Sequence, residues 1–254
     1  MIEKGGCVSR PSPTAHDAAV FDDWTPRGVV FDCDGLLVDT EPCWTLAEAE
    51  MFLRRGMPFR AEHKRLLIGK DLRTAATILQ EAFDEPGRTM AIAAELETLV
   101  GEVIADHAEP MPGAQAIVEL ASTRVPIAVA SNSSRRLLDL ALHRGGFADA
   151  FAVTVARDEA AQPKPAPDLY LRACAQLHIA PARALAFEDS PTGMRAAIAA
   201  GMRLISIPTL PRPEPRSDWV LPRLDHPALL GWITRWPTPV DRRAFETSDR
   251  QQPE

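Results

Sequence analysis

The feature that most constrains this chain is an apolar run that ends abruptly in two aspartates one residue apart, in the segment Gly28–Gly35 with the sequence GVVFDCDG. Its run VVF shows no polar alternation, which is typical of a central parallel strand covered on both faces. Ligands in open α/β sheets bind beyond the carboxyl ends of such strands. We therefore expect Asp32 and Asp34 at a site there, with Gly35 allowing a sharp backbone turn. A bound cation or a shared proton would relieve the repulsion between the two carboxylates. Taken alone, the segment could equally be an acidic turn without function.

Composition limits the classes of partner. The chain has 254 residues, 46% of them hydrophobic, which suits one large or two unequal globular domains. The net charge is −7, and no block of Lys and Arg alternates with aromatic residues, so we expect no nucleic acid partner. No apolar run approaches the roughly 20 residues that span a bilayer, and residues 1–23 lack the apolar core of a signal peptide. We expect no membrane partner and a cytoplasmic protein, in which the four cysteines are free thiols.

Strand and helix signals alternate along most of the chain, and one block shows helical signals only. Glu41-Pro42 predicts a helix start, and Gly56 predicts the end of that helix, with Leu46 and Leu53 at helical spacing. Further helices are predicted over 71–83 and 88–107 from apolar residues three and four apart. This block of about 65 residues reads as an insertion between the parts of an α/β domain.

The sequence therefore predicts an α/β fold, with a Rossmann-like parallel sheet core and an inserted all-helical domain. The predicted limits are a flexible segment 1–26, the core 27–42 and 109–235, the helical insertion 43–108, and a flexible tail 236–254. The core strands are predicted at 28–31, 125–130, 151–155, 184–187 and 203–207, with an edge strand at 219–221. The core helices are predicted at 114–122, 135–143, 168–177, 194–200 and 228–233.

Three further polar segments follow predicted strands or rigid turns. Ser131 and Asn132 end one strand immediately before a helix, where hydroxyl and backbone N–H groups suit an anion. Lys164 lies among three prolines that fix its loop. Glu188 and Asp189 follow another strand. Together with the opening aspartates, these groups are what phosphoryl transfer through an aspartyl-phosphate and Mg²⁺ requires.

In this order the segments resemble the motifs of the haloacid-dehalogenase (HAD) superfamily, in the branch with a helical cap after the first motif. The resemblance covers about residues 28–207. The matching segments are Phe31–Glu41 (FDCDGLLVDTE), Val129–Ser133 (VASNS), Lys164–Asp168 (KPAPD) and Phe187–Gly193 (FEDSPTG). The resemblance identifies the inserted helices as a cap domain.

The resemblance also implies a role for each matched residue. Asp32 would attack phosphorus, and Asp34 would protonate the leaving oxygen and later deprotonate water. Ser131, with Asn132 beside it, would bind phosphate oxygens, and Lys164 would neutralise both the nucleophile and the transferred group. The metal ligands implied for Mg²⁺ are the Asp32 carboxylate, the Asp34 backbone carbonyl and Asp189, with Glu188 close by or ligating.

Two residues of the insertion are candidates for substrate contact. Trp44 stands twelve residues after Asp32, where the β-phosphoglucomutases of this branch carry a histidine that controls the acid/base aspartate. An indole cannot carry that proton, so the sequence favours a phosphatase over a mutase. Trp44 could stack on a substrate ring or only fill space. Lys70, in the predicted turn Gly69-Lys70-Asp71, could reach substrate or lie in solvent.

We predict a Mg²⁺-dependent phosphomonoesterase acting on a small phosphorylated metabolite, such as a sugar phosphate. The alternatives are a β-phosphoglucomutase-like phosphomutase, or a non-enzymatic receiver-like or inactive binding module that also uses an aspartate, a hydroxyl and a lysine. A receiver lacks the Asp-x-Asp-Gly motif and an insertion of this length. The sequence leaves the oligomeric state and the substrate open.

Overall fold

The computed structural model describes residues 21, 24–209, 215 and 217–238. Most of both predicted flexible segments, residues 1–20 and 239–254, lies outside the described residues. Within the described part, no helix is both long and apolar enough to cross a membrane. Of the four cysteines predicted as free thiols, Cys33, Cys43 and Cys174 are free and buried, and Cys7 lies outside the described residues.

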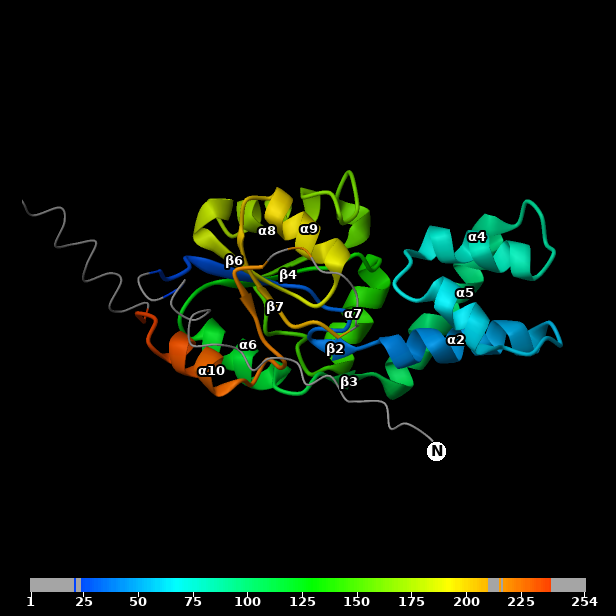
Figure 1. The fold of residues 1–254 in the computed structure, drawn as a ribbon, viewed down its shortest axis with the longest axis horizontal. Coiled ribbons are helices and arrows are strands. Elements are labelled where there is room, and N and C mark those ends of the chain that lie inside the picture. Colours follow the sequence, from blue (N-terminus) through cyan, green and yellow to red (C-terminus); the bar gives the residue numbers. More distant parts are fainter. Residues whose placement is uncertain (1–20, 22–23, 210–214, 216, 239–254) are drawn as a thin grey trace, which may run out of the picture.

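The core is a six-stranded parallel sheet in the order β5-β4-β1-β6-β7-β8, which confirms the predicted fold class (Figure 1). β1 (Gly28–Phe31) lies between β4 (Ile127–Ala130) and β6 (Ala184–Glu188), and all three are fully buried. The outer strands are β5 (Val153–Val155), β7 (Arg203–Ser206) and β8 (Trp219–Val220). Because parallel strands share one carboxyl edge, the residues after β1, β4 and β6 meet there.

The strand predicted from Val125 begins two residues later, at Ile127. Pro126 has no N–H to donate and contributes only its carbonyl, which accepts a hydrogen bond from the Val29 N–H at 3.0 Å. The residues that matter for function, at the carboxyl end of this strand, are unaffected by the difference.

Helices cover both faces of the sheet. α8 (Asp168–Gln176) and α9 (Pro191–Ala199) lie on one side, and α6 (Ala114–Ser122) and α10 (Pro227–Thr234) lie on the other (Figure 1). α7 (Arg135–Arg144) follows β4, and two 3₁₀ turns, η2 (Arg157–Glu159) and η3 (Pro181–Arg183), complete the described core. The sheet therefore has two apolar layers, as expected for a doubly covered parallel sheet.

The inserted domain contains four helices, α2 (Glu41–Arg54), α3 (Ala61–Leu67), α4 (Leu72–Ala82) and α5 (Thr89–His107). It joins the core through two antiparallel two-residue strands, β2 (Val38–Asp39) and β3 (Glu109–Pro110). In Figure 1 these helices project to one side of the core, beyond the β2–β3 pair. α3, β2 and β3 were not predicted, because segments so short carry little periodicity.

The two leucines whose spacing predicted α2 do not form its buried face. Leu46 and Leu53 are 52% and 70% exposed. The helix instead buries the stripe that contains Cys43, Ala47 and Met51. Spacing alone did not distinguish the two stripes, since both recur at helical intervals, and packing against α5 selected the second.

Aromatic residues extend the packed core at both ends. Phe21 and Trp236, which belong to the segments predicted as flexible, are buried. The Phe21 and Trp236 rings each lie with their centroids 4.8 Å from the centroid of Trp232 on α10. Burial of such large aromatic surfaces stabilises these positions, so the packing reaches beyond the predicted limits at 27 and 235.

The inserted domain also contacts the core between α5 and α7. Gly101 of α5 faces Arg136, and a Cβ there would lie 2.5 Å from Arg136 Nη1. Ser134, the residue that caps α7, donates its hydroxyl to Glu97 of α5. One helix of the insertion thus rests on the helix that follows the Ser131 loop.

Candidate active site

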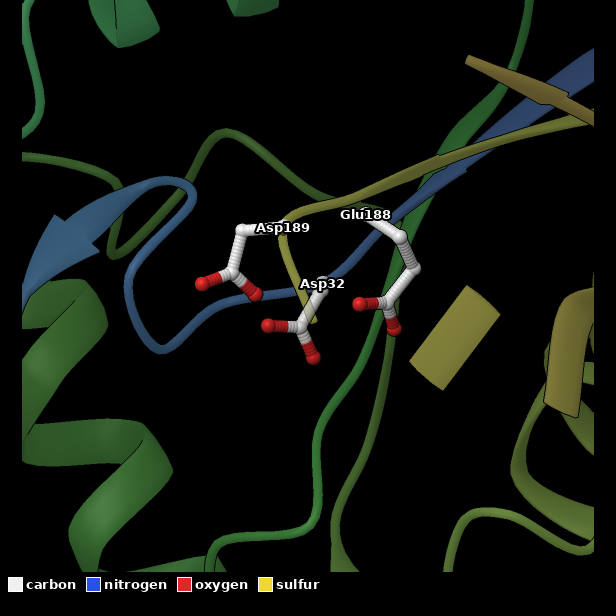
Figure 2. Close-up of side chains that lie close together, drawn as sticks. All are labelled: Asp32, Glu188 and Asp189. Atoms are coloured by element: carbon white, nitrogen blue, oxygen red, sulfur yellow. The ribbon is translucent and has the colours of Figure 1, made fainter. Parts of the chain in front are cut away.

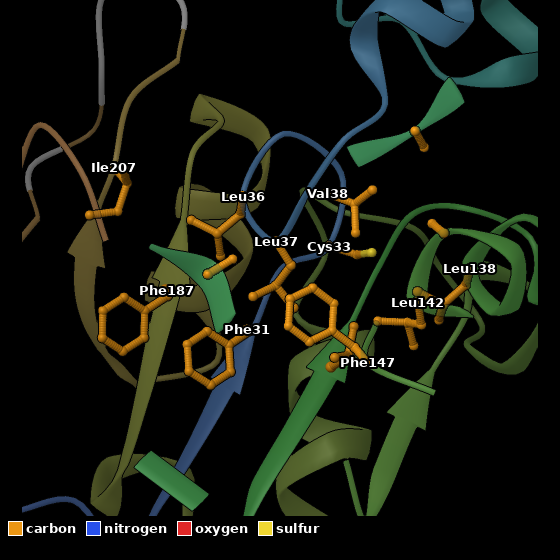
Figure 3. Close-up of a cluster of buried hydrophobic side chains, with 14 of the residues drawn as sticks. Phe31, Cys33, Leu36, Leu37, Val38, Leu138, Leu142, Phe147, Phe187 and Ile207 are labelled. Carbon is orange, nitrogen blue, oxygen red and sulfur yellow. The ribbon is translucent and has the colours of Figure 1, made fainter. Parts of the chain in front are cut away.

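The turn after β1 is anchored in the apolar core, and this anchoring places both aspartates. Leu36, Leu37 and Val38 are buried in the same apolar cluster as Phe31 and Phe187, whose rings stack with centroids 5.0 Å apart (Figure 3). The turn is closed by backbone hydrogen bonds, including Leu37 N–H to the Cys33 carbonyl at 2.9 Å. The polar side chains of the motif consequently lie at the sheet edge while its apolar ones fix the backbone.

Gly35 brings this turn against a second acidic segment. Its φ is +81°, in the left-handed region that favours glycine. A Cβ at this position would lie 2.6 Å from Asp189 Oδ2. Glycine is therefore required both by the backbone conformation and by the close approach of Asp189.

Lys164 lies buried between two carboxylates. Its Nζ donates to Asp32 Oδ1 at 2.5 Å and to Glu188 Oε1 at 2.6 Å. Burial by itself would lower the pKa of Lys164, but Asp32 and Glu188 raise it above its ordinary value. The lysine is thus held as a cation against the predicted nucleophile.

Asn132 fixes the backbone of this lysine. The Lys164 N–H donates to Asn132 Oδ1 at 2.8 Å, and Asn132 Nδ2 donates to the Lys164 carbonyl at 3.2 Å. In this arrangement Asn132 bridges two loops, so its side chain supports Lys164 where the sequence suggested a direct phosphate contact.

Three buried carboxylates, Asp32, Glu188 and Asp189, form an acidic cluster in which one oxygen of each lies within 4.8 Å of the others (Figure 2). Asp189 Oδ2 accepts a hydrogen bond from Thr209 at 2.6 Å, but among the described residues its buried Oδ1 has no hydrogen-bond partner. Burial, followed by the charge of Glu188, raises the pKa of Asp189 to about 7. Burial and Glu188 also raise the pKa of Asp32, although Lys164 opposes the shift.

These observations fit a divalent cation. One lysine does not balance three buried carboxylates, and the unpartnered Asp189 oxygen is a ready ligand. The donor set is made only of oxygen, as Mg²⁺ prefers. Glu188 differs from Asp189, because Lys164 and Tyr170 donate to its Oε1 and Ser190 donates to its Oε2.

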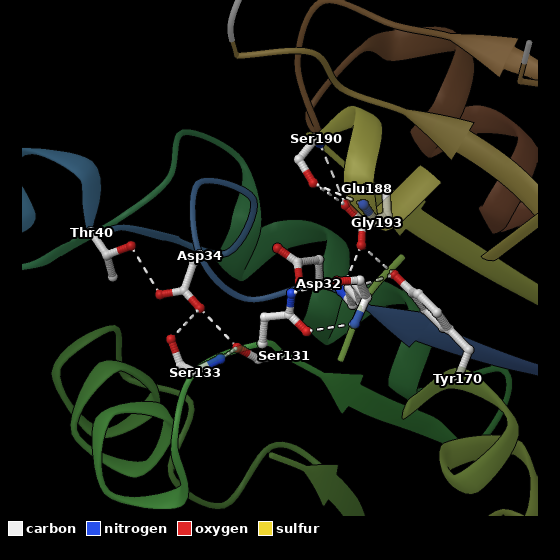
Figure 4. A network of polar contacts seen from close by, with 11 residues as sticks. Asp32, Asp34, Thr40, Ser131, Ser133, Tyr170, Glu188, Ser190 and Gly193 are labelled. Carbon is white, nitrogen blue, oxygen red and sulfur yellow. Dashed lines mark hydrogen bonds and ion pairs between the residues drawn. The ribbon is translucent and has the colours of Figure 1, made fainter. Parts of the chain in front are cut away.

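Asp34 is directed away from the acidic cluster (Figure 4). Its Oδ1 accepts from Thr40 at 2.9 Å, and its Oδ2 accepts from Ser131 at 2.8 Å and from Ser133 at 2.9 Å. Three hydroxyls from two loops therefore hold the predicted acid/base. Its side-chain oxygens do not belong to the cluster, so a ligand from this residue would have to come from its backbone.

The structure brings most of the predicted site residues together. Asp32, Lys164, Glu188 and Asp189 are in contact or within the acidic cluster, and Asp34 joins Ser131 beside it. Trp44 and Lys70 are not part of this network: among the described residues, no polar contact joins either side chain to it. Trp44 is half-buried on α2 against apolar neighbours, and Lys70 is exposed before α4.

Sequence reasoning missed several residues that complete the site: Thr40, Ser133, Tyr170, Ser190, Gly193 and Thr209. Ser133 could have been found, because it lies two residues from Ser131 in the same loop. Tyr170 gave no such signal, since a lone aromatic residue on an apolar helix face is typical of core packing.

A parallel sheet with paired aspartates after its central strand, a buried lysine and a second acidic pair at the same edge has the groups that phosphoryl transfer through an aspartate requires. The family model for haloacid dehalogenase-like hydrolases matches residues 26–201 of this chain. The chain belongs to the haloacid dehalogenase-like hydrolase family, which confirms the resemblance seen in the motifs and the expectation of an enzyme.

Relatives with assigned names align over most of the chain. The bifunctional riboflavin kinase/FMN phosphatase of Arabidopsis thaliana is 31% identical over 186 residues, which are 72% of this chain but only 49% of that protein. The fructose-1-phosphate phosphatase YqaB of Escherichia coli (strain K12) is 30% identical over 180 residues, covering 71% of this chain and 95% of that one. The crystal structure of CbbY from Rhodobacter sphaeroides in complex with phosphate aligns with a TM-score of 0.68 at 25% identity, covering 79% of this chain and 95% of that one.

Proposed function

We propose that this protein is a Mg²⁺-dependent phosphomonoesterase that hydrolyses a small phosphorylated metabolite through an aspartyl-phosphate on Asp32. One observation carries the proposal. Asp32 lies between a buried lysine that donates to it and a buried acidic partner, Asp189, whose Oδ1 has no hydrogen-bond partner in the part of the chain that the structure describes. A carboxylate with fixed positive charge on one side and a cation-binding oxygen on the other is suited to attack an anionic phosphate.

In the first step an Asp32 carboxylate oxygen forms a bond to phosphorus, and the bond from phosphorus to the alcohol oxygen breaks. Asp34 gives a proton to that departing oxygen. Lys164 keeps its contact with Asp32 and offers a donor to the transferred phosphoryl group. In the second step water attacks phosphorus, Asp34 takes the water proton, and the Asp32–phosphorus bond breaks to release inorganic phosphate.

Asp34 has to turn from its present hydrogen bonds to perform these transfers. The Ser131 hydroxyl donates to Asp34 Oδ2 at 2.8 Å. We propose that a bound phosphoryl group takes over the Ser131 hydroxyl, which removes one of the three donors that hold Asp34. Substrate binding and release of the acid/base would then be coupled through one serine.

The residues that would hold Mg²⁺ are Asp32, Asp189 and the Asp34 backbone carbonyl. When bound, the cation supplies positive charge beside the phosphoryl oxygens. The remaining electrostatic stabilisation comes from the chain itself, through the Lys164 ammonium and the hydroxyl of Ser131.

The names of the relatives support a phosphate monoester of a small, polar alcohol. The names of two aligned relatives specify FMN and fructose 1-phosphate, which are both monoesters of polyhydroxylated molecules. We therefore propose a sugar phosphate or a similar polyol phosphate as the substrate class. Trp44 and Lys70 remain candidates for contacts to its non-reacting part.

The decisive experiment is hydrolysis of p-nitrophenyl phosphate by the full chain with Mg²⁺ and with EDTA. We expect sustained turnover with Mg²⁺, none with EDTA, and none for Asp32→Asn. Asp149→Asn, the same substitution at an exposed position, is the matched control and should retain full activity. Wild-type rates for Asp32→Asn would refute the proposed nucleophile. Once Mg²⁺-dependent turnover is established, a panel of phosphorylated metabolites ranks the substrates.

The phosphomutase alternative has a separate test. β-Glucose 1-phosphate would be supplied with a bisphosphate primer, and glucose 6-phosphate would be measured against released phosphate. We expect released phosphate to dominate. A dominant isomerised product would reassign the enzyme as a mutase despite Trp44.

A further inference from the structure

Tyr170 lies beneath the site and contacts two of its charged groups. It is the only tyrosine of the chain, stands on α8, and is fully buried. Its hydroxyl donates to Glu188 Oε1 at 2.6 Å and lies 3.3 Å from Lys164 Nζ. The same ammonium lies 4.7 Å from the centroid of the phenol ring. The side chain thus touches both partners in the Lys164–Glu188 ion pair.

Packing alone does not account for a tyrosine here. The ring is surrounded by the apolar layer that α8 and α9 share with the sheet, and a phenylalanine would fill the same volume. A buried hydroxyl is unfavourable unless it makes a hydrogen bond, and the one made here is to a charged acceptor. Burial and the charge of Glu188 raise the pKa of Tyr170, so the phenol stays protonated and its O–H donates the hydrogen bond to Glu188.

Glu188 is held on a defined side of the acidic cluster. Both hydrogen bonds at Oε1, from Lys164 and Tyr170, are 2.6 Å long, whereas those from Ser190 to Oε2 are longer, at 3.3 and 3.4 Å. The carboxylate occupies space that exists because Gly193 has no side chain, since a Cβ there would lie 1.8 Å from Oε1. The short bonds at Oε1 therefore determine where Glu188 lies.

We propose that Tyr170 is a positioning residue: its hydroxyl holds Glu188 against Lys164, and Glu188 in turn places the ammonium on Asp32. The hydroxyl does not reach Asp32 and acts through these two charged groups. It also keeps Glu188 Oε1 occupied, while Asp189 Oδ1 accepts from no donor of the described residues. This inference rests on the proposed phosphomonoesterase function and adds a residue that none of the four motifs includes.

The test compares Tyr170→Phe with Cys174→Ala in the full chain with Mg²⁺. Cys174 is buried one helical turn further along α8 in the same apolar layer, and its sulfur contacts Met202, not Glu188. We expect Tyr170→Phe to lower kcat for p-nitrophenyl phosphate roughly tenfold, the effect of losing one hydrogen bond to a charged acceptor, with KM changed less than about twofold. Cys174→Ala should reduce thermal stability and leave kcat unchanged.

Equal kcat values for Tyr170→Phe and the wild type would overturn the inference, and so would equal losses of kcat in both variants, because the loss would then come from core packing.

A second measurement does not depend on activity. With ¹³Cζ-labelled tyrosine the chain gives one tyrosine resonance, which should shift in Glu188→Gln relative to wild type and stay in place in Cys174→Ala. An unshifted resonance in Glu188→Gln would refute the bond. If the wild type lacks Mg²⁺-dependent turnover, the proposed function fails while this comparison still tests Tyr170.

Discussion

Replacing Gly193 with alanine sets two physical effects against each other. Gly193 is the third residue of α9, and alanine in a helix is favoured over glycine by about 1 kcal/mol. The added Cβ, however, would lie 1.8 Å from Glu188 Oε1 and has to displace that carboxylate. The displacement breaks the short hydrogen bonds from Lys164 and Tyr170, and bonds to charged groups contribute roughly 1.5–3 kcal/mol each. We therefore expect a net loss of roughly 2–5 kcal/mol in the free energy of unfolding.

The matched control is Gly231→Ala. Gly231 also lies within a helix, α10, and a Cβ there has no neighbour within 4 Å. This variant should gain up to about 1 kcal/mol. Urea unfolding at constant m measures both variants, and the double variant Gly193→Ala/Glu188→Ala should recover part of the loss because the clash is gone. A Gly193→Ala protein as stable as the wild type would refute the argument that Glu188 occupies this space.

Three further predictions concern charged groups. Burial raises the pKa of Glu48 although Lys64 opposes the shift, so the folded protein holds the Glu48 carboxyl proton more tightly than the unfolded chain does. The stability of the wild type relative to Glu48→Gln should therefore fall as the pH rises above 4.5, measured by urea unfolding at a series of pH values. Asp71 caps α4, and hydrogen bonds from Thr74 lower the pKa of Asp71 against the effect of burial. Asp71→Ala should lower the free energy of unfolding by about 1 kcal/mol at neutral pH, and this difference from the wild type should vanish as acid protonates Asp71. Mg²⁺ at a hundred times its dissociation constant should stabilise the wild type by about 2.7 kcal/mol relative to EDTA, measured by thermal unfolding. It should not stabilise Asp189→Asn, and equal stabilisation of this variant would exclude Asp189 as a ligand.

The sequence predicted those parts of the fold and site that depend on local rules. The opening apolar run, the polar residues after each strand and the order of the four motifs were enough to predict a parallel sheet with Asp32, Lys164 and Asp189 near one edge. The carboxyl ends of parallel strands converge whatever the details of packing. The catalytic and metal-binding roles of these residues stay predictions until the variants are measured.

The remainder depends on contacts between distant segments. The buried stripe of α2 could not be chosen from periodicity, because the choice is made by α5. The role of Asn132 as a support for Lys164 required the loops to be placed side by side. Tyr170 shows the same limit, since its hydroxyl acquires a function only when Glu188, from another strand, is placed against it.

The β2–β3 pair has a consequence for the inserted domain as a whole. Val38 and Pro110 are partners in this pair, so the chain leaves the core and returns to it at neighbouring points. Seen from the core, the whole insertion is a loop whose ends are already closed, and the entropy of closing such a loop grows only slowly with its length. An insertion of another length would therefore add little loop-closure entropy, and its main cost would be the loss of the α5–α7 contacts, while Asp32 and its partners remain on the sheet. The fold thus keeps the proposed catalytic residues on the sheet, apart from an insertion that is joined to it at a single pair of short strands.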